Sequence, residues 1–189
     1  DPLWSRGLGD VYKRQVQNLL MREIDLALTL QPPDHPGLSA QPLAQGVLVA
    51  LAPQGFWPEH SRGQPLALQE LADAPLIGLS SADPLSARLD SYLKSVEPPP
   101  RVSIAVQTYS LARAMVESGA GLALIDPFTA LGASTANTAI RPLSPPLPIT
   151  LYAVTRAAEP PPHTLASLLE IFARQAPVSY THLTLPTKA

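Results

Sequence analysis

The chain of 189 residues is 46% hydrophobic and 15% charged, which provides enough apolar material for one medium domain or two small lobes and excludes intrinsic disorder. Its formal net charge of −2 lacks the basic excess that nucleic-acid binding needs, and the absence of cysteine excludes disulfides, thiolate zinc sites and a cysteine nucleophile. No apolar run approaches the roughly 18 residues of a membrane span, and no signal-peptide pattern opens the chain. We therefore expect a cytoplasmic protein without membrane contact.

The two ends of the chain differ in composition from the part between them. Two of the three lysines, Lys13 and Lys188, lie within residues 1–15 and 177–189, whereas eight arginines and the single Lys94 lie between these ends. Both ends also resemble translated sequencing-library adapter. We expect residues 1–15 and 177–189 to be non-native and leave them out of the fold prediction. Native disordered tails are the alternative.

The first half of the remaining chain predicts four elements separated by proline-rich turns. They are the tail of a helix at residues 16–23, an apolar strand at 24–30, a second strand at 46–53 and a short helix at 66–75. In the second half, a strand followed by a helix recurs. Strands are predicted at 75–80, 102–107, 122–125 and 148–155, and the final amphipathic helix at 163–175. This alternation predicts an α/β fold with a largely parallel sheet.

The glycines of the segment Gly119-x-Gly121 raise the question of a nucleotide-binding loop. Such a loop follows a strand and opens a helix, so that the phosphates lie at the helix N-terminus. Here the helical spacing of Leu111, Ala114 and Met115 comes before the glycines. We therefore predict that Gly119 ends a helix and that the pair forms a turn into the next strand.

Polar side chains follow three of the predicted strands. They are Ser80, Ser81 and Asp83 after the first, Thr108, Tyr109 and Ser110 after the second, and Asp126 after the third. Ligands of α/β proteins bind at the carboxyl ends of strands, and hydroxyls beside helix N-termini favour a carboxylate or another anion. A carboxylate such as Asp126 would instead suit an amine or a guanidinium.

Helix capping is the ordinary alternative for these polar residues, because Ser, Thr and Asp are common N-caps. We favour capping over ligand contact for Asp83 and Asp126, each of which is followed by a proline at the first helical position. For residues 108–110, three consecutive hydrogen-bonding side chains exceed what one cap requires, and both interpretations stay open.

Catalytic and metal-binding patterns are missing from the sequence. It contains no nucleophile elbow, zinc-protease motif, Walker loop or S-x-x-K motif. The histidines at 35, 60 and 163 lie far apart in proline-rich surroundings, without metal-ligand spacing. We predict that the protein is not an enzyme and has no catalytic residue, metal site or cofactor.

Six segments occur in an order and spacing that carry a family resemblance across residues 16–176. They are REIDLALTL, PLAQGVLVALAP, ELADAPLIGLSSADPLSARLDSYL, VQTYSLARAMVESGAGLALIDPF, PLPITLYAVTR and LASLLEIFARQ. Together they resemble the effector-binding domain of LysR-type transcriptional regulators. The segments LIGLSSADPLSARLD and GLALIDPFTA look closest to the branch that regulates lysine and opine metabolism.

The resemblance implies a two-lobe α/β fold of the periplasmic-binding-protein type II, with lobe I incomplete at its N-terminus. Lobe I would comprise residues 16–50 and 151–176, and lobe II residues 51–150. A small effector, such as an amino acid or an opine-like carboxylate, would bind between the lobes of a homodimer or homotetramer and modulate transcription. By the pattern of the family, the cleft residues would be Thr29, Gln31, Ser80, Ser81, Thr108, Tyr109 and Asp126.

Family members carry a winged helix-turn-helix, a linker helix and the first strand of lobe I before the position of Val16. We therefore expect DNA binding only through that missing domain. A solute-binding protein of a transporter shares the fold and is the alternative. An upstream helix-turn-helix would indicate the regulator, and an export signal would indicate the transporter protein. An enzyme built on this fold is a third possibility, but it lacks a catalytic constellation.

We predict that this chain has reduced stability and binds effector weakly or not at all, because lobe I lacks a strand. Denaturant unfolding and ligand titration of the purified chain test this expectation. Soluble material that unfolds cooperatively and binds a ligand tightly would contradict it.

Overall fold

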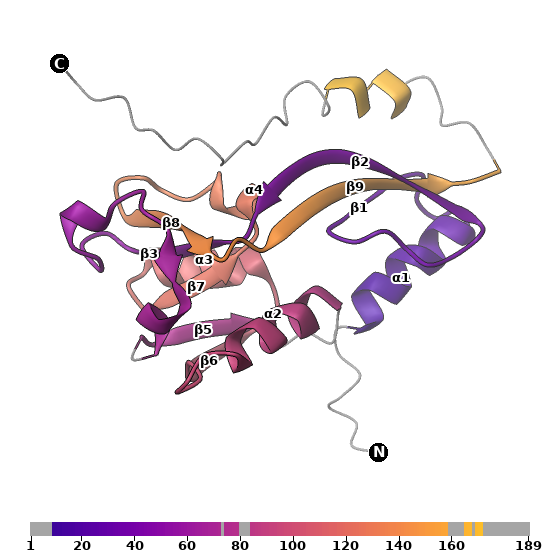
Figure 1. Ribbon diagram of the computed structural model, residues 1–189. Coiled ribbons are helices and arrows are strands. Elements are labelled where there is room, and N and C mark those ends of the chain that lie inside the picture. Colours follow the sequence, from indigo (N-terminus) through magenta and orange to yellow (C-terminus); the bar gives the residue numbers. More distant parts are fainter. Residues whose placement is uncertain (1–8, 73, 80–83, 159–164, 168, 172–189) are drawn as a thin grey trace. The chain divides into compact units, whose positions relative to one another are not determined.

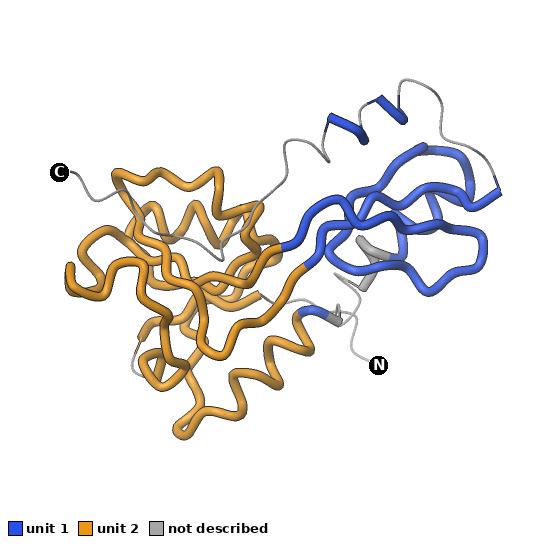
Figure 2. Tube along the Cα trace, turned by 45° about the horizontal axis from the view of Figure 1, so that its top comes forward, with its two compact units in different colours: residues 1–45, 81–85, 150–178 blue, residues 46–80, 86–149, 179–189 orange. Residues whose placement is uncertain are grey.

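The computed structural model describes residues 9–72, 74–79, 84–158, 165–167 and 169–171. These residues form two compact units, which Figure 2 distinguishes by colour. Unit 1 contains the described residues of 1–45, 81–85 and 150–178, and unit 2 contains those of 46–80 and 86–149. Apart from Pro84 and Leu85, which belong to unit 1, the described chain passes from one unit to the other at residues 45/46 and 149/150. The lobe boundaries predicted from the sequence were 50/51 and 150/151.

Unit 1 combines a helix with a small sheet (Figure 1). The elements are α1 (Gly9–Leu20), β1 (Ala27–Thr29), β2 (Leu38–Val47) and β9 (Pro148–Arg156), with the strand order β1-β9-β2 and β1 antiparallel to β9. One buried cluster joins α1 to the sheet through Leu19, Ala27, Leu38 and Val154. A second cluster joins the sheet to the helical residues 165–167 and 169–171 through Leu43, Ala153 and Leu169.

The boundaries of α1 differ from the prediction. The helix begins at Gly9, inside the segment left out as non-native, and ends at Leu20, not at residue 23. Arg22 has a φ of 62°, a left-handed conformation that cannot continue a helix. The following turn is fixed by Arg156, which donates to the carbonyl of Leu19 at 3.1 Å and to that of Ile24 at 2.9 Å.

Unit 2 is built on a six-stranded sheet with the order β4-β8-β3-β7-β5-β6. Its strands are β3 (Val49–Pro53), β4 (Leu66–Ala67), β5 (Leu76–Leu79), β6 (Val102–Val106), β7 (Leu122–Ile125) and β8 (Thr138–Ser144). Its helices are η2 (Glu59–Ser61), η3 (Leu68–Leu71), α2 (Pro84–Lys94), α3 (Tyr109–Glu117) and α4 (Pro127–Ala130). The predicted strand–helix repeats between residues 75 and 130 are therefore confirmed for the described residues.

The sheet of unit 2 is mixed, with three parallel and two antiparallel pairs among its described strands, so the expectation of a largely parallel sheet holds only in part. Strand β5 pairs in parallel with β6 and β7, but β3 is antiparallel to both β7 and β8. Parallel neighbours need a crossover connection, usually a helix, between them. Strand β3 follows β2 after the single residue Leu48, so no crossover helix sets its direction.

Helices cover both faces of this sheet. Helices α3 and α4 contact one face, in a buried cluster that contains Val49, Leu51, Ile77, Val106, Ala112, Val116, Ala123, Ile125 and Ala130. Along their strands, Leu76 and Leu124 alternate with Ile77 and Ala123. Their side chains therefore project from the opposite face of the sheet, which α2 covers. Full burial of each large aliphatic side chain stabilises the fold by about 1.5–3 kcal/mol.

Strands β2 and β8 were not predicted from the sequence. The short helix predicted at residues 66–75 is present as η3 but is shorter, and residues 66 and 67 form β4 instead. Strand β8 contains Arg141, whose side chain is only 4% exposed. The Arg141 guanidinium donates to the Glu70 carboxylate at 2.8 and 3.1 Å and to the carbonyls of Gln64 and Pro65, and it lies 5.4 Å from the Trp57 ring centroid. These hydrogen bonds hold the pKa of Glu70 below its usual value. They fasten the 54–71 segment to β8.

The turn after α3 has the form predicted from the glycine pair. Gly119 has a φ of 85° and donates to the carbonyl of Val116 at 2.9 Å, while Ala120 donates to that of Met115 at 3.0 Å. These are the two hydrogen bonds of a Schellman motif, which satisfies carbonyls of the last helical turn. The interpretation of the pair as a helix-to-strand turn is confirmed.

Gly121 serves a different purpose from Gly119. Its φ is 151°, and a Cβ at this position would overlap the carbonyl oxygen of Pro75. The same oxygen accepts a hydrogen bond from the Leu122 N–H at 3.0 Å. The absence of a side chain therefore allows β7 to begin directly beside the start of β5.

We predict that Gly121→Ala lowers the free energy of unfolding by about 3 kcal/mol or more, because a Cβ adds overlap with Pro75 to an unfavourable backbone conformation. Gly119→Ala is the matched control, since open space surrounds its Cβ position. Only the left-handed backbone is strained there, at a cost of about 1–2 kcal/mol. Urea denaturation of both variants measures the difference, and equal losses would contradict the close-approach explanation.

Candidate functional site

Three neighbouring parallel strands of unit 2 end at one edge of the sheet. Leu79 of β5 is level with Val106 of β6, and Ile77 of β5 is level with Ala123, two residues before the end of β7. Thr108, which follows β6, and Asp126, which follows β7, are therefore brought to one edge. Because β5 lies between β6 and β7, the outer two strand ends are about 10 Å apart.

Thr108 follows β6 and is the N-cap of α3. Its Oγ1 accepts a hydrogen bond from the Leu111 N–H at 3.2 Å, and the residue is exposed. The hydroxyl proton can still be donated to another acceptor, because a hydroxyl donates and accepts at once. Tyr109, the first residue of α3, is half-buried and packs against the core beneath that helix.

Asp126 follows β7 and caps α4, as the sequence predicted. Its Oδ1 accepts from the N–H groups of Phe128 and Thr129, at 3.0 and 2.8 Å, and Pro127 occupies the first helical position. The residue is 3% exposed. Asp126 therefore has a structural role that accounts for a buried carboxylate at this position.

Ser80 and Ser81 lie outside the described residues, as does Asp83. In unit 1, Thr29 ends β1 and is buried, and its hydroxyl donates to the carbonyl of Gln31 at 2.6 Å. Gln31 is half-buried in the bend that follows. The structure thus groups Thr108, Tyr109 and Asp126 in one unit, and Thr29 and Gln31 in the other.

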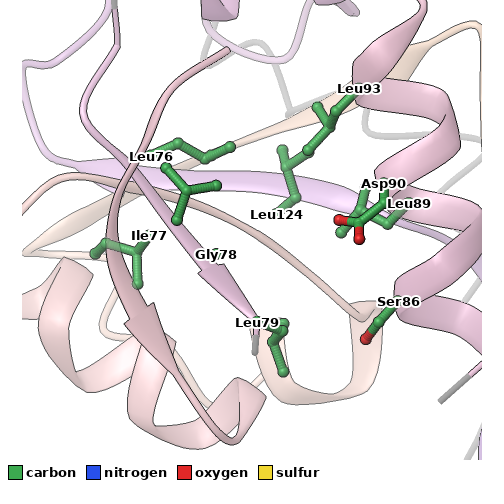
Figure 3. Close-up of a pocket in the computed structure, with 10 residues that line it drawn as sticks. Leu76, Ile77, Gly78, Leu79, Ser86, Leu89, Asp90, Leu93 and Leu124 are labelled. Atoms are coloured by element: carbon green, nitrogen blue, oxygen red, sulfur yellow. The ribbon is translucent and has the colours of Figure 1, made fainter. Parts of the chain in front are cut away.

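A small hollow lies below the carboxyl end of β5, between this strand and α2. Figure 3 shows Ser86 and Asp90 projecting from α2 toward the strand, where Gly78 has no side chain. The hollow has a volume of about 30 Å³. This volume accommodates a water molecule and not a metabolite. A ligand of the strand ends would therefore lie outside this hollow.

Ser86 was not predicted from the sequence, although a signal was present. Ser86 precedes Leu89 by three residues and Leu93 by seven, so it lies on the apolar face of α2. The structure shows it 4% exposed beside the small hollow between β5 and α2. The signal in the sequence was the position of this serine, a polar residue, among the apolar residues of one helix face.

The strand ends offer hydroxyl donors and a helix N-terminus, which together suit the binding of an anion. Within the described ranges, His, Asp and Glu side chains nowhere gather in threes that could hold a metal ion. Among the same residues, every helix is too short or too polar to cross a lipid bilayer.

Known proteins resemble the chain in sequence and in fold. A family model described as the LysR substrate binding domain matches residues 10–177. The HTH-type transcriptional regulator DgcR of Pseudoalteromonas sp. is 36% identical over 132 residues, which is 70% of this chain and 45% of that protein. The chain thus spans about half the length of this curated relative.

Solved structures show the same fold at low sequence identity. The regulatory domain of CcmR from Synechocystis PCC6803, in complex with 2-PG, has a TM-score of 0.67 at 14% identity over 86% of this chain and 78% of that chain. CbnR is a LysR family transcriptional regulator whose full-length structure was solved in complex with its target DNA. It has a TM-score of 0.64 at 18% identity, over 86% of this chain and 56% of that chain. The predicted α/β fold of the regulatory-domain type is confirmed.

We predict that Asp126→Ala lowers the free energy of unfolding by about 1–2 kcal/mol, because two N–H groups of α4 lose their acceptor. Asp126→Asn keeps an acceptor of the same shape, so we expect a loss below about 0.5 kcal/mol. Urea denaturation near neutral pH measures both values. An alanine variant as stable as the parent chain would show that the cap contributes nothing.

Proposed function

Since the chain belongs to the LysR substrate-binding domain family, we propose that it is the sensor domain of a bacterial transcriptional regulator. In this proposal it binds a small metabolite, and binding changes how the regulator acts on transcription. The relative DgcR is named a transcriptional regulator, which supports a sensor domain over the solute-binding protein of a transporter.

The proposed class of ligand rests on the carboxyl ends of β5, β6 and β7, which end level with one another in unit 2. The exposed hydroxyl of Thr108 lies at the N-terminus of α3, where unpaired N–H groups favour a carboxylate. We therefore propose an amino acid or an opine-like carboxylate as the effector. The proposed contacts are Thr29, Gln31, Ser80, Ser81, Thr108, Tyr109 and Asp126.

The effector would act by binding one conformation of the regulator more tightly than another, because only a difference in affinity shifts such an equilibrium. DNA would be bound by a separate domain of the full-length protein, in a homodimer or homotetramer. The complexes of CcmR with 2-PG and of CbnR with DNA support a role of this kind. We propose further that the protein is not an enzyme and acts in the cytoplasm.

The test uses the full-length protein encoded by the reading frame that contains this domain. Thermal unfolding is measured with lysine, octopine, nopaline and other amino acids and opines. We expect one of these compounds at about 100 times its Kd to raise the Tm by about 5 °C, because ligand binding then adds about 2.7 kcal/mol to stability. The same compound should change binding of the protein to the DNA upstream of its own gene.

Gln31→Ala and Gln69→Ala form a matched pair for this test. Gln31 is a proposed effector contact, whereas Gln69 is an exposed glutamine of η3. We expect Gln31→Ala to reduce the ligand-induced rise in Tm and Gln69→Ala to leave it unchanged. An export signal in place of an upstream helix-turn-helix would refute the proposed function. Equal ligand responses of the two variants would refute the proposed site.

A further inference from the structure

Unit 2 contains a groove at the edge of its sheet opposite to the strand ends described above. Strand β3 is antiparallel to β7, so the carboxyl end of β3 lies where β7 begins, and Thr138 of β8 is level with Pro53. The groove opens at this edge and has a volume of about 410 Å³. Its lining includes Gln54, Arg62, Leu131, Thr135, Thr138 and Ile140.

The lining combines an apolar interior with a cation at the rim. Alanine side chains and Ile140 form much of the surface, and Leu131 leaves 61% of its area exposed. A ligand that removes a large apolar side chain in a bounded hollow from water lowers the free energy of the system, which favours binding. Arg62 supplies the positive charge. Its ion pair with Glu59 spans 3.9 Å, and the Glu59 side chain is 88% exposed.

The walls of the groove are fixed by hydrogen bonds at several points. The Gln54 N–H donates to the carbonyl of Asn137 at 2.8 Å, and the Thr138 hydroxyl donates to that of Ser134 at 2.8 Å. The segment that carries Arg62 is held two residues later, where the Gln64 carbonyl accepts from buried Arg141 at 3.0 Å. A hollow formed in this way loses little conformational freedom when it is filled.

We propose that this groove is a second ligand site, which binds a small carboxylate with an apolar body, such as a medium-chain fatty acid. The hydrocarbon would cover Leu131 and the alanines, and the carboxylate would take the place of Glu59 beside Arg62. Small-molecule sites of proteins have volumes of about 300–1,000 Å³, lined mostly by apolar side chains with a few polar groups. The ten lining residues are fewer than the roughly 20–30 that a stable protein interface uses on each side.

Isothermal titration calorimetry of the full 189-residue chain tests the proposal with octanoate, octylamine and 1-octanol, which share a hydrocarbon and differ in charge. We expect octanoate to bind more tightly than either of the others. Arg62→Gln should weaken octanoate binding about fivefold and remove its advantage over 1-octanol, since an ion pair at a partly exposed rim contributes about this factor. NMR shifts of Leu131 and Ile140 methyl groups should follow the same titration.

Two further variants separate the groove from other surfaces. Thr135→Trp changes an exposed residue of the lining, so we expect the fold to persist, which circular dichroism measures. The indole should occupy the groove and abolish octanoate binding. Arg101→Gln removes an exposed arginine elsewhere in unit 2 and should leave octanoate binding unchanged. Absence of octanoate binding, equal binding of octylamine, or binding that survives Thr135→Trp would overturn the proposal. None of these outcomes bears on the proposed effector site, because that site lies at the other edge of the sheet.

Discussion

The level strand ends of unit 2 depend on one close contact between backbones. At Gly121 the chain passes so near the carbonyl of Pro75 that a side chain has no room, and the neighbouring N–H of Leu122 bonds to that carbonyl. This contact fixes the start of β7 against the start of β5. Because Leu79 at the end of β5 is also level with Val106 at the end of β6, the three strands end level, and Thr108 and Asp126 come to one edge. A shift of one residue would turn the side chains of β7 to the opposite face of the sheet.

Local physical chemistry explains which parts of the fold could be predicted from the sequence. The strands at residues 76–79, 102–106 and 122–125 are short apolar runs, and Thr108 and Asp126 are N-caps whose hydrogen bonds reach only two or three residues along the chain. Strand β8 could not be recognised in this way. Its residue Arg141 is buried only because Glu70, 71 residues away, supplies a bidentate partner, and no local pattern shows such a pairing.

The contrast between local signals and distant contacts also applies to the strand-end site and to the groove. The strand-end residues were found in the sequence because caps and turns have local signatures. The mixed direction of the sheet was not predictable, since it depends on where β3 enters the unit. The groove depends on that direction. An antiparallel β3 carries Gln54 to the edge where β8 begins, and the hydrogen bond from Arg141 to the Gln64 carbonyl then holds the Arg62 segment there. Neither step follows from residue spacing.

The two polar residues at the strand ends differ in what they can offer a ligand. The hydroxyl of Thr108 accepts the capping N–H of Leu111 and still has a proton to donate, so one residue can serve both the helix and an anion. The carboxylate of Asp126 only accepts, and Oδ1 already receives two N–H groups. Its buried negative charge would repel a ligand carboxylate and attract an amine at the same edge. A hydroxyl donor and a carboxylate at the same edge would therefore suit a ligand that carries both a carboxylate and a cation.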